Sequence, residues 1–193
     1  MKDSSMDNCT LREYIDQKKI KDVKLHLGCG GVKYPDFINI DLYPSDSNIE
    51  DCSRGFCIAD VYCDIRKLDV EPNSVTEIFS SHVVEHFVKW EAQAMFKNWY
   101  TVLKKDGKLI IETPDFLRCV MLLFHIKKRH RVNARSQFYG NQKDKLMYET
   151  HRYVWDAKEI KCELLNTGFS KVTVTHKTKT HKKFRDMRII AIK

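Results

Sequence analysis

The stretch that most constrains the fold is Leu25 to Asp41, LHLGCGGVKYPDFINID, in which glycines lie between two short apolar runs. A glycine turn followed by a second apolar run that ends in a carboxylate is typical of the first unit of a nucleotide-binding α/β sheet. Only seven residues, Val32 to Ile38, separate the glycines from the Asn-Ile-Asp that ends the second run. A helical crossover between parallel strands takes about a dozen residues. The sequence therefore predicts an α/β sheet whose first crossover is shortened to a tight turn or a single helical turn.

Strand-like and helix-like segments alternate along the rest of the chain. Apolar or alternating runs predict strands at 23–27, 37–42, 74–80 and 108–112, and a short apolar piece lies at 58–62. Apolar residues at helical spacing predict helices at 83–103, 115–128 and 155–166, with a long polar loop over 132–150. The last two strands, 170–176 and 184–192, have no helix between them and should pair antiparallel. This order predicts an α/β fold with a mostly parallel sheet and a C-terminal antiparallel hairpin.

The glycine turn narrows the class of ligand. A dinucleotide fingerprint needs a third glycine and a helix N-terminus for the pyrophosphate, but Lys33 stands at that glycine's position and the crossover is too short for a regular helix. A P-loop is excluded because no Gly-Lys-Ser/Thr follows. Asp41, at the end of the second strand, is placed to accept hydrogen bonds from ribose hydroxyls. A ligand with a ribose and no phosphate, such as S-adenosylmethionine, fits both observations; the alternative is a tight turn with Asp41 as a cap.

Length and composition indicate one domain over residues 1–193, large enough to bury a core without disulfides. Residues 1–22 are expected to form an N-terminal helical extension, opened by the capping box Thr10 to Glu13. No stretch approaches the roughly 20 apolar residues of a membrane span, and the N-terminus lacks the apolar core of a signal peptide. The seven cysteines are scattered and form no C-x-x-C pair. We therefore expect a cytoplasmic protein with reduced thiols.

The net charge of +8 comes largely from two basic segments, 127–131 and 177–185. Nucleic acid or an anionic surface could use such segments. The interpretation we favour is a solvated helix end and a charged edge strand, because no aromatic residues are interleaved as single-strand binders require. Nucleic acid is therefore a partner that the sequence permits but does not favour.

The series LHLGCGG, FINIDL, DIRKLDVEPNSVTEIFSSHVVEHF, VLKKDGKLIIETPDF and LLNTGF resembles the class I S-adenosylmethionine-dependent methyltransferases. It is similar in particular to a group of small predicted methyltransferases with the pattern GCG, FINxD, DIRKLP, SxHxxEHF, VLKPGG, VPD. The motifs occur in the same order from about Lys24 to Phe169. The resemblance implies a Rossmann-like three-layer αβα fold with a mostly parallel seven-stranded sheet. It also implies S-adenosyl-L-methionine as cofactor and S-adenosyl-L-homocysteine as product.

The resemblance also implies roles for individual residues at the cofactor site. Residues 28–30 would line the methionine end, Asp41 would take the ribose hydroxyls and Leu42 would lie beside the adenine. Asp64 would accept from the adenine amino group, and Ile65 would pack on its ring. Ser81 and His82 would border the transferred methyl. The cofactor-binding residues expected in this way are Gly28, Cys29, Gly30, Asp41, Leu42, Asp64, Ile65 and Ser81.

The segment from His82 to His86, HVVEH, matches the H-x-x-E-H pattern of a family of zinc proteases. Two histidines four residues apart on a helix can bind one zinc ion. The pattern lies at a strand-to-helix junction, where His82 precedes regular helix. The order of elements offers no obvious third ligand. We therefore expect no metal, a zinc hydrolase only as a remote alternative, and His86 as a partly buried histidine that hydrogen-bonds to a neighbour.

Transfer of a methyl group to a hydroxyl needs alignment of the acceptor and removal of its proton. The candidates for the general base are His82, Asp115 and His151, where Asp115 could instead cap a helix and His151 could be a loop histidine. Proteins of the resembling group look like glycan-tailoring enzymes, so a sugar hydroxyl is the expected acceptor. Other small molecules, lipid hydroxyls and RNA are the alternatives. The chain could also be one domain of a larger glycan-building protein.

Overall fold

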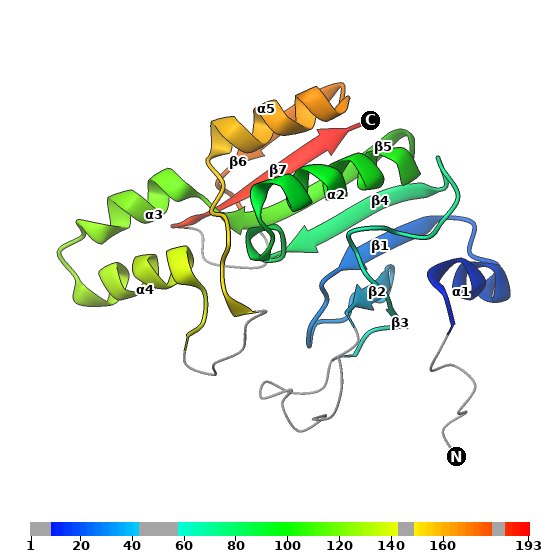
Figure 1. Cartoon of the computed structure of the whole chain (residues 1–193), viewed down its shortest axis with the longest axis horizontal. Helices are drawn as coiled ribbons and strands as arrows, with labels where there is room; N and C mark the ends of the chain where they lie inside the picture. The colour runs from blue at the N-terminus through cyan, green and yellow to red at the C-terminus, as the bar shows by residue number, and fades with distance from the viewer. Residues whose placement is uncertain (1–8, 43–57, 143–148, 179–183) are drawn as a thin grey trace, which may run out of the picture.

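The computed structural model describes residues 9–42, 58–142, 149–178 and 184–193 of the chain. Its centre is a seven-stranded sheet in the order β3-β2-β1-β4-β5-β7-β6 (Figure 1). Neighbouring strands are parallel from β3 to β5, whereas β7 pairs antiparallel with both β5 and β6. The predicted Rossmann-like sheet, with its antiparallel C-terminal strands, is confirmed. The strands are β1 (Val23–Leu27), β2 (Ile38–Asp41), β3 (Val61–Tyr62), β4 (Val75–Ser81), β5 (Leu103–Pro114), β6 (Lys171–Thr175) and β7 (Asp186–Ile192).

The two faces of the sheet differ in chemistry because side chains alternate along each strand. Leu25, Ile78 and Ile111 represent the face that forms the apolar core. Helices α2 (Lys89–Val102) and α5 (Ala157–Thr167) pack side by side on this face, with Phe96 and Trp99 of α2 fully buried (Figure 1). Burial of large apolar side chains contributes about 1.5–3 kcal/mol each, so this layer dominates the stability of the fold.

The opposite face carries His26 and Phe79 at its centre, with Tyr34 and Phe37 of the β1–β2 connection packed against them. That connection has no helix. Instead, the buried Asn39 side chain accepts a hydrogen bond from Tyr34 N–H and donates to the carbonyls of Tyr34 and Phe37. The shortened crossover predicted from the seven-residue spacing is thus confirmed as a loop, and its aromatic residues cover the sheet where a crossover helix would otherwise lie.

The remaining helices are α1 (Leu11–Lys18), α3 (Phe116–Leu123) and α4 (Lys128–Tyr139). The predicted capping box at Thr10 and Glu13 opens α1. Helices α3 and α4 pack against each other beyond the carboxyl ends of the parallel strands (Figure 1). No helix in the part of the chain that the structure describes has the length and apolarity to cross a membrane.

Several predicted boundaries are wrong: the helix expected over 115–128 ends at Leu123, and the strand expected over 108–112 begins already at Leu103. The helix expected over 83–103 begins only at Lys89, after the short 3-10 turn η2 (Val84–His86). The loop expected over 132–150 contains most of α4, which the weak apolar periodicity of its sequence did not indicate. Ala134 of α4 is fully buried where α4 packs on α3, so tertiary contact rather than local pattern stabilises this helix. Residues 143–148 of the expected loop lie outside the described residues.

Candidate functional site

The glycine turn after β1 is held by backbone hydrogen bonds. The N–H groups of Gly28 and Cys29 both donate to the carbonyl of Ile40, at 2.9 and 3.1 Å. Gly28 has a φ of 69°, and a Cβ there would lie 2.2 Å from a methyl of Val83, so a side chain is excluded. Gly30 also has a positive φ, 51°, but a Cβ there would meet no atom within 4 Å. The turn therefore presents open backbone at Gly30, as a cradle for a ligand requires.

Asp41 connects this turn to the end of β2. Its Oδ2 accepts a hydrogen bond from Gly30 N–H at 2.6 Å, and its Oδ1 accepts one from Leu42 N–H at 2.8 Å. A carboxylate has about four acceptor positions, so lone pairs remain for two ribose hydroxyls. Leu42 is 61% exposed and available for contact with a ligand. The residues predicted for the methionine and ribose ends thus lie together; we call residues 28–31 with Asp41 and Leu42 the cofactor turn.

The structure gives other partners to Asp64 and Ile65, two of the three residues predicted for the adenine. The carboxylate of Asp64 is bound by the backbone N–H and the guanidinium of Arg66, at 2.7–2.9 Å. These hydrogen bonds lower the pKa of Asp64. Ile65 is buried in the core, and its carbonyl accepts a hydrogen bond from the indole of Trp99 at 2.8 Å. Their roles toward adenine stay predictions.

His82 directly follows Ser81, the last residue of β4, and has a left-handed backbone with a φ of 55°. Its Nε2 lies 3.1 Å from Asp186 of β7, and its Nδ1 lies 3.0 Å from Glu85. Burial alone would lower the pKa of His82, but these two carboxylates raise it to about 9. The ring is therefore an imidazolium at neutral pH. It is held between Glu85, which follows β4, and Asp186, the first residue of β7.

Glu85 is fully buried at the centre of this group. Its Oε2 accepts a hydrogen bond from the Thr113 hydroxyl at 3.0 Å, and its backbone carbonyl accepts from the N–H groups of Arg152 and Tyr153. Burial alone would raise the pKa of Glu85, but the contact with His82 lowers it to about 2. A buried, ionised carboxylate at this place is a residue for which the sequence analysis assigned no role, although the HVVEH motif contains it.

His86 and His151 face each other beside Glu85. Their ring centroids are 4.8 Å apart and the rings are nearly perpendicular. Nδ1 of His86 lies 3.1 Å from the Thr150 carbonyl, which confirms the predicted hydrogen bond of this histidine to a neighbour. Nδ1 of His151 lies 2.6 Å from the Gln137 carbonyl. Burial lowers the pKa of His151, so its ring is neutral at pH 7. We call His82, Glu85, His86, His151 and Asp186 the histidine network.

Asp115 lies apart from the histidine network. Its Oδ1 accepts a hydrogen bond from Leu117 N–H at 3.0 Å and caps α3. Its Oδ2 lies 2.7 Å from Nε2 of His176, a residue that the sequence analysis did not single out. Asp115 is only 3% exposed. Both oxygens thus have partners, in agreement with the capping role that the sequence left open.

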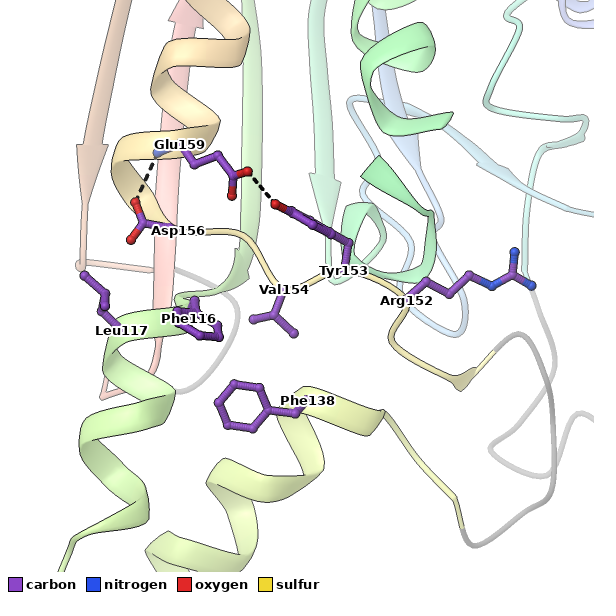
Figure 2. A pocket seen from close by; sticks show the side chains of 8 residues that line it. All are labelled: Phe116, Leu117, Phe138, Arg152, Tyr153, Val154, Asp156 and Glu159. Carbon is purple, nitrogen blue, oxygen red and sulfur yellow. Dashed lines mark hydrogen bonds between the residues drawn. The ribbon is translucent and has the colours of Figure 1, made fainter. Parts of the chain in front are cut away.

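A cavity of about 490 Å³ lies between α3, α4, the start of α5 and the segment that follows His151. Figure 2 shows the aromatic rings of Phe116 and Phe138 beside Val154, with Tyr153 and Arg152 on the other side. The Tyr153 hydroxyl donates a hydrogen bond to Glu159. The cavity therefore combines aromatic and apolar walls with a few charged groups. Its lining residues are Phe116, Leu117, Phe138, Arg152, Tyr153, Val154, Asp156 and Glu159.

Comparisons with known proteins agree with this arrangement. Residues 25–111 match a family described as "Methyltransferase domain". An S-adenosylmethionine-dependent methyltransferase from Archaeoglobus fulgidus is 16% identical, with a TM-score of 0.56 over 95% of this chain and 91% of that chain. Another from Mesorhizobium loti is 14% identical, with a TM-score of 0.55 over 89% of this chain and 90% of that chain. No curated protein matches the chain.

A third structure was solved with the cofactor. Phosphoethanolamine N-methyltransferase 2 of Haemonchus contortus, in complex with S-adenosyl-L-methionine, is 13% identical, with a TM-score of 0.51 over 90% of this chain and 49% of that chain. The family match extends from β1 into β5 and includes the cofactor turn. In sequence and fold the chain is thus similar to S-adenosylmethionine-dependent methyltransferases, and this similarity supports S-adenosylmethionine as its cofactor.

Proposed function

We propose that the protein transfers a methyl group from S-adenosylmethionine to a hydroxyl of a sugar or glycan. The methyltransferase part rests on the cofactor turn, where Gly30 N–H and Asp41 meet at the ends of adjacent parallel strands. Bound there, the cofactor supplies an electrophilic methyl on a sulfonium. The backbone of residues 28–30 would hold its methionine end, and Asp41 would hold its ribose.

The residues that line the cavity are the reason for proposing a sugar as the acceptor. Sugar rings pack their apolar faces on aromatic side chains and direct their hydroxyls to fixed polar groups. Phe116, Phe138 and Tyr153 supply the first kind of surface, and Asp156 and Glu159 supply the second. The same chemistry would serve other small hydroxyl compounds, which remain the alternatives within this proposal.

Among the three predicted bases, His151 has the properties that proton abstraction needs. Its Nδ1 faces a carbonyl oxygen, which only accepts, so Nδ1 carries the hydrogen and Nε2 keeps a lone pair. The lowered pKa of His151 leaves the ring neutral at pH 7 and ready to take a proton. His82 is already protonated, and Asp115 is bound to the α3 N-terminus and His176. We therefore propose His151 as the base and His82 as a positioning residue at the end of β4.

RNA is the second candidate acceptor, and the α3–α4 region favours it. Residues 116–142 contain basic side chains and no acidic one. Lys127, Lys128 and Arg129 are exposed at the start of α4. A surface of this kind binds polyanions with a steep dependence on salt. We also keep a cytoplasmic location, and a place within a larger glycan-building protein, as proposals.

The test has two stages. S-adenosylmethionine or S-adenosylhomocysteine should raise the melting temperature by linkage, whereas NAD should not. No shift at millimolar cofactor would refute the methyltransferase proposal. A labelled-methyl transfer screen should then use nucleotide sugars, deoxysugar glycosides, other small alcohols, lipids and RNA. Transfer to sugars supports the acceptor proposed here. Transfer only to RNA, with binding lost between low and moderate salt, would replace it.

A further inference from the structure

Three side chains in the histidine network have the composition of a metal site. Glu85, His86 and His151 each offer a ligand atom, and these atoms all lie within 4.8 Å of one another. Two come from the HVVEH motif, and the third comes from the segment before α5, which crosses the end of the sheet. The sequence offered no third ligand for this motif because His151 lies far along the chain. The fold supplies it.

Both histidines are oriented as metal ligands are. Nδ1 of His86 faces the Thr150 carbonyl and Nδ1 of His151 faces the Gln137 carbonyl, so in the neutral form of either ring Nδ1 donates and Nε2 keeps the lone pair. Metal-binding histidines almost always donate their other N–H to a carbonyl or carboxylate in this way, which fixes the tautomer and the ring orientation. The two rings are thus set to offer Nε2 without rearrangement of their hydrogen bonds.

Glu85 brings the negative charge that such a site needs. Its Oε2 is fixed by Thr113, as a metal-binding carboxylate is fixed by its surroundings. Its Oε1 is buried and, within the described residues, accepts no hydrogen bond of regular geometry. Nδ1 of His82 approaches Oε1 to 3.0 Å, but His82 also has Asp186 as an independent partner. Oε1 can therefore bind an ion while His82 remains paired.

We propose that Glu85, His86 and His151 bind a divalent transition-metal ion, with Zn²⁺ as the best-matched ion. Two imidazole nitrogens and one carboxylate oxygen are the ligand set of catalytic zinc sites, which keep a fourth position open. Ligand atoms about 2 Å from one ion lie roughly 3–4 Å apart, so the side chains must contract slightly when the ion binds. The ion would neutralise a carboxylate that is otherwise buried beside one cationic histidine.

His151 is followed directly by Arg152 and Tyr153, which line the cavity. A metal ion lowers the pKa of a bound hydroxyl and so removes the need for a protein base. This use of the ion rests on the proposed methyltransferase function, whereas the binding of the ion does not. Nε2 of His151 has a single lone pair, so His151 acts as the proposed base only in the metal-free protein and as a ligand once the ion is bound.

The test is a Zn²⁺ titration of the full chain, first stripped with a chelator, in competition with a chromophoric chelator. We expect one tight site per chain, with affinity reduced at least about 100-fold in His86→Ala and in His151→Ala. Thr113→Val, which removes only the hydroxyl that fixes Glu85, should cost about 10- to 100-fold. Co²⁺ bound to the unmodified chain should give visible absorption bands of a four- or five-coordinate site, a readout that needs no variant.

The chain contains a matched control for adventitious binding. His125 and His130 form a second histidine pair near the start of α4, with ring centroids 4.3 Å apart, but His125 is exposed and neither is placed in the site. The double variant His125→Ala/His130→Ala should keep the tight site. Loss of binding in this variant, retention in His86→Ala and His151→Ala, or the absence of any stoichiometric site would overturn the proposal. A melting-temperature shift with S-adenosylmethionine that persists in such a case would leave the methyltransferase proposal standing.

Discussion

The cofactor turn and the histidine network lie at the same edge of the sheet but are built in opposite ways. The cofactor turn is local: its characteristic contact, Gly30 N–H to Asp41, joins residues 11 apart. The histidine network is assembled from distant parts of the chain. His86 and Thr150 are 64 residues apart, and His82 and Asp186 are 104 apart.

The two regions also use different chemistry. The cofactor turn relies on backbone N–H groups and on glycine conformations, which any ligand of the right shape can use. The histidine network relies on buried charges that neutralise one another, with His82 between two carboxylates. In the proposed function, the local backbone geometry of the cofactor turn binds the cofactor. The buried charges of the histidine network, which come from distant parts of the chain, position and activate the catalytic groups. Four variants or conditions test this contrast.

The largest expected effect is a loss of turnover when a residue of the histidine network is replaced. His151→Ala should lower the rate of methyl transfer by about 10²- to 10⁴-fold, because it removes the proposed general base. The melting-temperature shift with S-adenosylmethionine should be unchanged, because the cofactor turn is separate. The measurement is kcat beside cofactor binding, with exposed His125→Ala as the matched control. Full activity in His151→Ala would remove His151 from the mechanism.

The next effect is on stability. Glu85→Gln keeps the shape of the side chain but leaves His82 with one carboxylate instead of two. Breaking a buried ion pair by removing one partner costs about 3–5 kcal/mol, and the remaining Asp186 should reduce this to about 2–3 kcal/mol. Urea unfolding should show the loss. Glu163→Gln on α5 is the control, because that partly exposed carboxylate has only surface partners and should cost less than about 1 kcal/mol.

In the cofactor turn, Gly28→Ala should destabilise the fold by about 2–3 kcal/mol and abolish cofactor binding. The new methyl would clash with Val83, and an L-residue is strained at this φ. Gly31→Ala is the matched control, because Gly31 belongs to the same turn but has no positive φ and has open space at its Cβ position. Comparable loss in both variants would show that the turn does not depend on Gly28 in particular.

The smallest effect is a pH dependence of stability. The folded-state pKa of His82, about 9, is above its ordinary 6.5, so its stabilising contribution is complete below pH 6.5 and is lost as the pH rises through 9. The free energy of unfolding should therefore fall as the pH rises over this interval. His82→Asn, which tolerates the left-handed backbone, should flatten the decline. An unchanged profile in His82→Asn would assign the decline to another group.

The fold was largely predictable because its signals are local. Alternating strands, the seven-residue spacing after Gly31 and the capping box at Thr10 each fix a nearby piece of backbone. Helix α4 was missed because its stability comes from packing on α3. The cofactor turn was predictable for the same reason as the strands, since Gly28, Gly30 and Asp41 are neighbours in sequence and in space.

The histidine network was only half predictable. His82 and His151 were identified as candidates, yet nothing in the sequence shows that Glu85 lies between them or that Asp186 holds His82. The contact with Asp186 depends on how β7 enters the sheet beside β5, and the position of Glu85 beside His151 depends on the segment before α5. The properties that separate the two histidines, a raised pKa for His82 and a lowered one for His151, follow from burial and from these distant carboxylates. They become visible only once the chain is folded.

The insertion of β7 between β5 and β6 has a consequence for biosynthesis. A protein chain is synthesised from the N-terminus onward, so β1, β2 and β4 can pair before β7 has been made. His82 then lacks Asp186, and β5 lacks its neighbour on one side, until β7 has been synthesised. A nascent chain can therefore form the turn for its methyl donor well before it forms the histidine network. The proposed cofactor site can therefore form early in synthesis, whereas the proposed catalytic histidine network requires β7.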